Sequence, residues 1–277
     1  MARVTVVVDN NAGPGLESEH GLSLWLEHQG ACLLYDTGAG RALMPNLKAL
    51  GLEPERLEGV ILSHGHYDHT GGLEELLRRR RRAGLDTPVW CHPAIFAPHL
   101  KDDPEGPRYI GPPHPGQEPY QRLGADFHFI IGQDQPRAGL CLLAPVPRRT
   151  PFEKPHPELV TVQGQHLVPD PFYDDLALVL EGSRGPVVIT GCAHSGVINV
   201  LLAAEQAVGR RPVMLLGGTH LGPAPLEQRE RALAELAARP ELRVVAGHCT
   251  GPEVMKTLAK MLGDRFTPLA AGLVLEL

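Results

Sequence analysis

The stretch Ser63-His64-Gly65-His66-Tyr67-Asp68-His69-Thr70-Gly71-Gly72 is the most informative part of this chain. It carries three imidazoles and one carboxylate within six residues, directly after an apolar run at 60–62 and directly before a helical pattern. Zinc and similar divalent ions bind this mixture of nitrogen and oxygen ligands. In an extended segment, side chains two apart point the same way, so His64, His66 and Asp68 would converge, while His69 follows as the chain turns into the helix. A histidine-rich surface loop is the alternative, but the preceding strand and the Gly-Gly pair favour a metal site.

The composition is that of an ordinary globular protein. The chain has 277 residues, of which 43% are hydrophobic and 21% charged, and this length suits one large α/β domain or two small ones. The formal net charge of −6 argues against a nucleic-acid-binding or membrane-surface protein. The one basic run, residues 78–82, ends a predicted helix, where cations favour the helix dipole and usually face solvent. A phosphate-binding role for this run is the less favoured alternative.

The termini and cysteines indicate a cytoplasmic protein. The N-terminus is charged at Arg3 and has no apolar run of signal-peptide length, and no stretch reaches about 18 uninterrupted apolar residues. The five cysteines form no CxxC pair, which suits a reducing compartment better than a disulfide framework. We therefore predict a small-molecule substrate and no membrane or nucleic-acid partner. The oligomeric state stays open, with a homo-oligomer as one alternative.

Strand and helix patterns alternate in the first and last thirds of the chain. Strands are predicted at 4–8, 22–26, 32–35, 60–62, 89–91, 176–180, 187–190, 213–216, 243–246 and 273–275. Helices are predicted at 41–50, 73–82, 196–208, 226–238 and 252–262. Each half thus gives strands and then helices, which predicts two sheets packed face to face with helices outside, as one domain over residues 1–277.

Residues 97–120 differ from the rest because they contain seven prolines. Such a density argues against regular structure. Long loops within a compact domain are usually functional or disordered. We predict that this insertion is a lid beside the site. A second proline-rich stretch spans residues 145–157.

Three later segments share one pattern, in which an apolar strand is followed by glycine and then by polar residues that include a histidine. They are residues 189–196, 216–220 and 246–251. Strand ends that open onto helices are where α/β folds place ligands. We therefore predict that His194 and His248 bind metal and that His220 is either a ligand or a substrate contact.

The remaining candidates leave two interpretations open. The thiols of Cys192 and Cys249 could bind zinc, although a packing role as small buried hydrophobes is favoured. Asp174 and Asp175 could bind metal or orient a histidine from behind, or they could simply begin a strand.

The motif His64-x-His66-x-Asp68-His69 resembles the metal motif of the metallo-β-lactamase fold superfamily, and Tyr35-Asp36-Thr37-Gly38 resembles its structural aspartate turn. A closer similarity is to the 7,8-dihydropterin-6-methyl-4-(β-D-ribofuranosyl)-aminobenzene-5'-phosphate synthase-like branch. It rests on Val8-Asp9-Asn10, Glu19-His20-Gly21-Leu22-Ser23, residues 62–72, Asp174-Asp175-x-Ala177-Leu178, Gly191-Cys192-x-His194-Ser195-Gly196 and His248-Cys249-Thr250-Gly251.

The resemblance implies a four-layer αββα sandwich with a metal site at one edge of the sheets. His64, His66 and His194 would bind a first metal, and Asp68, His69 and His248 a second. Cys192 stands where many members carry a bridging aspartate, so one metal and two metals both stay open. His66 stands where redox relatives carry glutamate, which favours Zn²⁺, with Mn²⁺ and Fe²⁺ as alternatives.

These features predict a metal-dependent hydrolase in which a metal-bound hydroxide attacks a small anionic substrate. By analogy, the substrate would be phosphorylated or pterin-like. Asp68 would orient the nucleophile, and His220 would donate to the substrate oxyanion. One alternative is a pterin-type transferase or synthase on the same site. The other is a non-catalytic metal- or ligand-binding protein.

Overall fold

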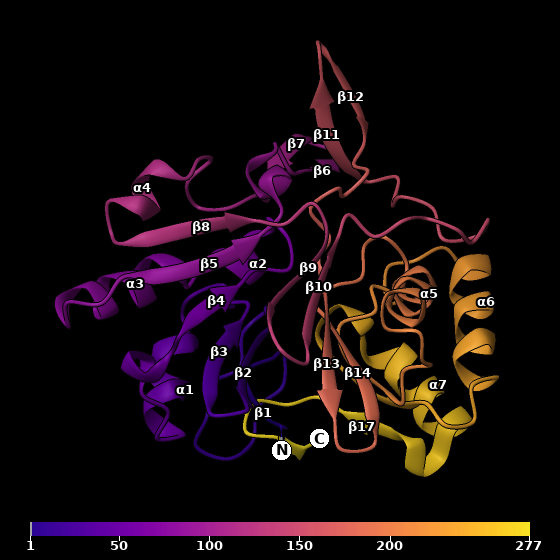
Figure 1. Ribbon diagram of the computed structural model, residues 1–277. Coiled ribbons are helices and arrows are strands. Elements are labelled where there is room, and N and C mark those ends of the chain that lie inside the picture. Colours follow the sequence, from indigo (N-terminus) through magenta and orange to yellow (C-terminus); the bar gives the residue numbers. More distant parts are fainter. Residues whose placement is uncertain (1) are drawn as a thin grey trace.

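Two seven-stranded sheets lie face to face in the computed structural model, which describes residues 2–277. Figure 1 shows α1 (Leu43–Ala49) and α3 (Leu73–Arg82) outside the first sheet, and α5 (Val197–Val208), α6 (Leu226–Ala237) and α7 (Pro252–Leu262) outside the second. In spatial order, the first sheet consists of β18 (Val274–Glu276), β1 (Ala2–Val8), β2 (Ser23–His28), β3 (Ala31–Tyr35), β4 (Gly59–Ile61), β5 (Thr87–Cys91) and β8 (Ala125–Phe129). The second consists of β17 (Phe266–Pro268), β16 (Arg243–Ala246), β15 (Met214–Gly217), β14 (Gly185–Thr190), β13 (Ala177–Gly182), β10 (Leu140–Ala144) and β9 (Gly132–Arg137). The predicted four-layer α/β sandwich is confirmed.

Side chains that alternate along each strand produce these layers. In β2, Leu24 and Leu26 belong to the core between the sheets, whereas Trp25 packs with the side chains of α1 and α3. In β14, Ile189 joins the same central core, and Val188 packs with the side chains of α5 and α6. Successive residues of a strand face opposite sides, so a strand covered on both faces needs a continuous apolar run. The continuous apolar runs in the sequence therefore reflect strands that are covered on both faces.

The basic run at the end of α3 is only partly on the surface. Leu73, Leu76 and Arg80 lie three and four residues apart, so they share one face of the helix, and all three are buried. The Arg80 guanidinium donates from Nε to Oγ1 of Thr87 at 2.8 Å and from Nη1 to the carbonyl oxygen of Pro54 at 2.6 Å. The expectation that the run faces solvent is therefore wrong for Arg80, which joins the helix to its neighbours.

The proline-rich segment contains regular structure, so the prediction for residues 97–120 is wrong in this respect. A third sheet has the order β12 (His166–Pro169), β11 (Leu159–Gln163), β6 (Leu100–Asp103) and β7 (Gly106–Tyr109), and a short helix α4 (Glu118–Gln121) follows. Prolines are tolerated here by position. Pro104 lies in the turn between β6 and β7, Pro107 lies on the edge strand β7, and Pro119 lies in the first turn of α4. Figure 1 shows the β11–β12 hairpin projecting beyond the two large sheets.

Five strands between residues 125 and 169 were not predicted, namely β8 to β12. The sequence of β9, Gly132 to Arg137, is mostly polar because this strand is an exposed sheet edge, so it carries no apolar alternation. The short remaining elements are α2 (Tyr67–Thr70) and the 3₁₀ turns at Pro54–Arg56, Pro93–Phe96, His248–Thr250 and Gly263–Arg265. Among residues 2–277, no helix is long and apolar enough to cross a bilayer.

Candidate metal centre

The predicted ligands lie at the carboxyl ends of parallel strands. The motif at 63–69 follows β4, His194 follows β14, and His248 follows β16. Strands β14, β15 and β16 run parallel, as do β3 and β4, so the segments that follow them meet at one edge of the sandwich. One detail of the prediction is wrong, because Asp68 lies on the short helix α2 and not in an extended segment. All six predicted metal ligands are buried, namely His64, His66, Asp68, His69, His194 and His248.

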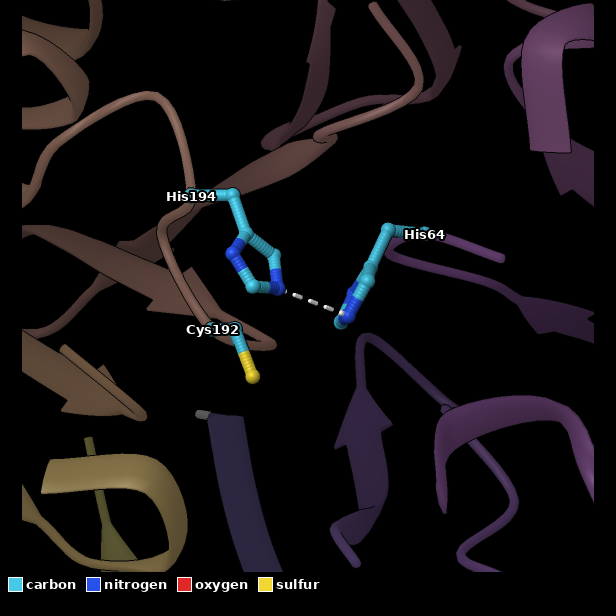
Figure 2. A group of neighbouring side chains, drawn as sticks. All are labelled: His64, Cys192 and His194. Atoms are coloured by element: carbon cyan, nitrogen blue, oxygen red, sulfur yellow. Dashed lines mark hydrogen bonds between the residues drawn. The ribbon is translucent and has the colours of Figure 1, made fainter. Parts of the chain in front are cut away.

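The first group of side chains forms around His64 and His194. Their Nε2 atoms lie 3.2 Å apart, and Figure 2 shows both rings pointing toward a common space. The ring of His66 lies beside them, with its centroid 4.7 Å from that of His64 and 4.8 Å from that of His194. The His66 Nε2 atom is buried and has no hydrogen-bond partner within residues 2–277. Phe172 stacks on His194 with centroids 3.9 Å apart and thereby fixes the plane of that ring.

The second group forms around His69 and His248, whose Nε2 atoms lie 3.1 Å apart. Asp68 Oδ2 lies 3.3 Å from Nε2 of His248 and 3.7 Å from Nε2 of His69. The Cys192 sulfur lies 3.3 Å from Nε2 of His69. Cys192 also belongs to both groups, because its sulfur lies within 4.8 Å of the ligand atoms of each histidine pair. The thiol therefore lies between the two groups.

Asp36 determines which ring nitrogens are free to bind metal. Its carboxylate accepts from Nδ1–H of His69 at 2.7 Å and from both the backbone N–H and the hydroxyl of Ser63 at 2.7 Å. Because the Ser63 hydroxyl proton is donated to Asp36, its oxygen accepts from Nδ1–H of His64 at 2.9 Å. His69 and His64 therefore both present an unprotonated Nε2 toward the centre.

A second chain of hydrogen bonds orients the other side of the centre. Nδ1–H of His248 donates to Oδ1 of Asn10 at 3.0 Å, and Nδ2–H of Asn10 donates to Nδ1 of His20 at 3.3 Å. Nε2–H of His20 then donates to Oδ2 of Asp68 at 3.2 Å. Burial lowers the pKa of His248, but Cys249 and Asp68 outweigh it and raise the pKa to about 9. This side of the centre therefore attracts a positive charge at neutral pH.

These donors fit a divalent cation of the zinc type. Imidazole nitrogen, carboxylate oxygen and thiol sulfur are the ligands that zinc prefers. Within residues 2–277 the Nε2 atom of His66 has no hydrogen-bond partner, and the unprotonated Nε2 atoms of His64 and His69 face other candidate ligands, namely His194, His248 and Cys192. A cation satisfies such lone pairs, and the carboxylate behind His69 is the usual partner of a metal-binding histidine.

A cavity of about 340 Å³ opens onto the centre, and its lining includes His66, Asp68, Cys192, His194 and His248. His220, the predicted ligand or substrate contact, also lines it, with its ring centroid 4.3 Å from that of His194. Burial lowers the pKa of His220 to about 3. His220 is therefore a neutral imidazole, which can donate one hydrogen bond into the cavity.

Asp174 and Asp175 hold the backbone of the histidine-bearing loops. Oδ2 of Asp174 accepts from the backbone N–H of Gly65 at 2.7 Å, and Oδ2 of Asp175 accepts from that of Ser195 at 2.7 Å. His99, which was not predicted, lies behind Asp174, with its Nε2 atom 3.2 Å from the carboxylate. These aspartates therefore position the loops that carry His64, His66 and His194 through the backbone beside them.

Alkaline pH should weaken the fold through His99. Burial lowers the pKa of His99, but Asp174 and Asp170 outweigh burial and raise it to about 10. Because the pKa of His99 is higher in the folded protein than its ordinary value of 6.5, protonation of His99 stabilises the fold. This stabilisation is complete below pH 6.5 and is lost as the pH rises through about 10. His99→Gln should therefore cost of the order of 3 kcal/mol near pH 6 and little above pH ~10. Urea unfolding across this range measures the difference, and an equal loss at both ends would contradict the ion pair.

Several residues of the site were not predicted as such from the sequence. From the sequence, the polar segment that contains His20 and Asn10 could be either a loop next to the site or an ordinary turn, and their contacts with Asp68 and His248 place it at the site. Phe172 gives no sequence signal, since one aromatic residue among prolines fits many roles.

Comparisons with known proteins agree with this fold. The model of the metallo-beta-lactamase superfamily matches residues 18–248. The 7,8-dihydropterin-6-methyl-4-(beta-D-ribofuranosyl)-aminobenzene-5'-phosphate synthase of Methanocaldococcus jannaschii is 26% identical over 270 residues, which cover 94% of this chain and 90% of that protein. The crystal structure of Tm1679, a metal-dependent hydrolase of the beta-lactamase superfamily, superimposes with a TM-score of 0.85 at 27% identity and covers 100% of this chain and 99% of that chain. Zn²⁺-bound PqqB from Methylobacterium extorquens shares the fold, with a TM-score of 0.60, 16% identity, and coverage of 99% of this chain and 100% of that one.

Proposed function

Because the chain belongs to the metallo-beta-lactamase superfamily, we propose that it is a metal-dependent hydrolase acting on a small anionic substrate. The main support is the convergence of the histidine and aspartate side chains on a cavity that Lys101 and Arg108 also line. The similarity to Tm1679 over the whole chain agrees with hydrolysis.

We assign the ligands as the family resemblance implies, and the contacts agree in grouping His64 with His194 and Asp68 and His69 with His248. His64, His66 and His194 would hold one divalent ion, and Asp68, His69 and His248 a second, with Zn²⁺ favoured by the donor set. Such an ion supplies Lewis acidity and lowers the pKa of a coordinated water toward about 7. Burial raises the pKa of Asp68, but His69, His20 and His248 together hold it well below its usual range, so the carboxylate stays ionised. Asp68 can therefore bind metal and orient the nucleophile.

The chain also provides groups that would bind the substrate. His220, as a neutral imidazole, donates one hydrogen bond toward a developing oxyanion. Lys101 and Arg108 lie on the β6–β7 hairpin and share the carboxylate of Asp103, at 3.2 and 2.9 Å. Asp103 neutralises only one of these two cations, so the group formed by Lys101, Asp103 and Arg108 keeps one positive charge beside the cavity, although Asp102 and Glu105 give the hairpin as a whole a formal charge of −1. We propose that the proline-rich segment covers the site through its β6–β7 hairpin and that an anionic group of the substrate binds to Lys101 and Arg108.

Removing this positive charge should weaken substrate binding more than turnover. A hydrogen bond to a charged group contributes about 1.5–3 kcal/mol, so Arg108→Ala should raise KM roughly tenfold or more with little change in kcat. The matched control is Arg122→Ala, which removes an exposed arginine outside the cavity. Steady-state kinetics at two salt concentrations measures both. An unchanged KM in Lys101→Ala and Arg108→Ala would contradict the proposed anion contact.

A pterin-type transferase on the same site is the alternative, and the nearly full-length similarity to the Methanocaldococcus jannaschii synthase favours it. Elemental analysis of the purified protein, followed by a metal-dependent screen, separates the two. We expect hydrolysis of phosphoesters, lactones or thioesters that is lost on chelation and restored by Zn²⁺. Joining of a pterin to an aminobenzene ribose phosphate, without hydrolysis, would replace the hydrolase by a transferase. Bound metal with turnover of neither class would favour a non-catalytic binding protein.

A further inference from the structure

Cys192 and Cys249 lie next to each other at the end of β15. Strands β14, β15 and β16 lie side by side in parallel register, with Thr190 opposite Gly217 and Gly217 opposite Ala246. Cys192 follows the first of these strands and Cys249 follows the third. The middle strand ends on Gly217 and Gly218, which have no side chains, so the cysteines from the two flanking strands can approach each other over it.

The contacts around Gly218 show how close this approach is. A Cβ atom on Gly218 would lie 2.5 Å from the Cys249 sulfur and 3.3 Å from Cα of Cys192. The Cys249 thiol donates to the backbone carbonyl oxygen of Cys192 at 3.8 Å, so its sulfur lies against the residue that carries the other thiol. The backbone N–H of His220 donates to the Cys249 sulfur at 3.2 Å and holds it in place. Gly218 thus leaves room for the Cys249 sulfur to lie against the backbone of Cys192.

Both thiols can be reached from the cavity. Cys249 is half-buried and Cys192 is buried, yet both line the cavity of about 340 Å³. The other three cysteines, Cys32, Cys91 and Cys141, are buried and do not line it. A small oxidant that enters the cavity therefore meets a pair of neighbouring thiols.

We propose that Cys192 and Cys249 form a reversible disulfide when the protein meets a peroxide. The more exposed Cys249 sulfur attacks the O–O bond and becomes a sulfenic acid, and the peroxide leaves as water. The Cys192 thiol then attacks the Cys249 sulfur, forms the S–S bond and releases the sulfenic oxygen as a second water. The protein loses two electrons and two protons, which the peroxide gains.

Formation of the disulfide removes the Cys192 thiol from the metal centre. Its sulfur lies between the two histidine pairs, and bonding to Cys249 takes away its capacity to bind a cation there. This part of the proposal rests on the proposed metal-dependent function, whereas formation of the disulfide does not. Oxidised protein should bind less metal, and bound metal should slow the oxidation.

The test is mass spectrometry of the chelated protein after hydrogen peroxide treatment. We expect loss of the mass of two hydrogen atoms, a non-reducing digest in which the Cys192 and Cys249 peptides are joined, and reversal by a thiol reductant. Cys192→Ser and Cys249→Ser should each abolish the crosslink, while the matched control Cys32→Ser keeps it.

The outcomes separate the two parts of the proposal. Addition of two or three oxygen atoms to Cys249, with Cys192 still open to alkylation, would overturn the disulfide. A crosslink that leaves metal content unchanged would support the disulfide and overturn its coupling to the metal. A crosslink in a protein whose reduced form binds no metal would support the disulfide and overturn the proposed hydrolase.

Discussion

The His66→Ala and Asp68→Ala proteins are expected to lose both bound metal and turnover. A metal ion contributes several kcal/mol of transition-state stabilisation, so its loss should lower kcat/KM about a thousandfold or more. His66 has a buried Nε2 atom with no partner within residues 2–277, so its removal breaks no internal hydrogen bond made by that atom. For His66→Ala the loss should therefore appear in metal content and rate while the fold persists, whereas Asp68→Ala also removes the acceptor of the hydrogen bond from His20.

Three measurements distinguish this result from unfolding. Elemental analysis gives metal per chain, circular dichroism reports the fold, and kinetics with added Zn²⁺ tests whether activity can be restored. The matched control is His166→Ala, which removes an exposed histidine on the β12 strand, away from the centre. Metal-free His66→Ala protein that kept its activity would rule out the proposed mechanism.

The sequence predicts much of this architecture because apolar strands buried on both faces leave an unambiguous pattern. The strands at 187–190 and 243–246 and the helix at 73–82 are confirmed within two residues. The edge strand β9 and the hairpin β6–β7 were missed, since an exposed or edge strand needs neither apolar alternation nor the absence of proline. The apolar pattern of a sequence reflects the burial of its side chains, and the side chains of these elements are only partly buried.

The candidate site likewise contains some residues that the sequence predicts and others that it does not. His64, His66, His194 and His248 could be predicted as candidates because they follow predicted strands, and the structure brings the ends of these strands from both sheets to one edge of the sandwich. His20 approaches Asp68 through a loop fold that no periodicity encodes. The position of Cys192 between the histidine pairs likewise depends on three-dimensional geometry, and the sequence alone favoured a packing role for it.

Replacing Asp36 is expected to give the largest loss of stability in the protein. Its carboxylate is fully buried and accepts three hydrogen bonds, from His69 and from two groups of Ser63. Asp36→Ala leaves these donors unsatisfied, which should cost about 3–5 kcal/mol. Its backbone φ of 59° lies in the left-handed region, where alanine is less tolerated than asparagine or aspartate, and this adds about 1 kcal/mol of strain.

Asp36→Asn separates the charge from the backbone. Asparagine tolerates the same φ, and it keeps one carbonyl acceptor but loses the negative charge behind His69. We therefore expect a smaller loss of stability than for alanine, together with metal affinity lowered by about 10–100-fold, as for other partners of metal-binding histidines. Denaturant unfolding of the metal-free protein and metal titration of the folded protein measure the two effects separately, with the exposed Asp264→Asn as the control. Equal metal affinity in Asp36→Asn and the native protein would mean that the carboxylate supports only the fold and does not set the Nε2 lone pair of His69 toward the metal.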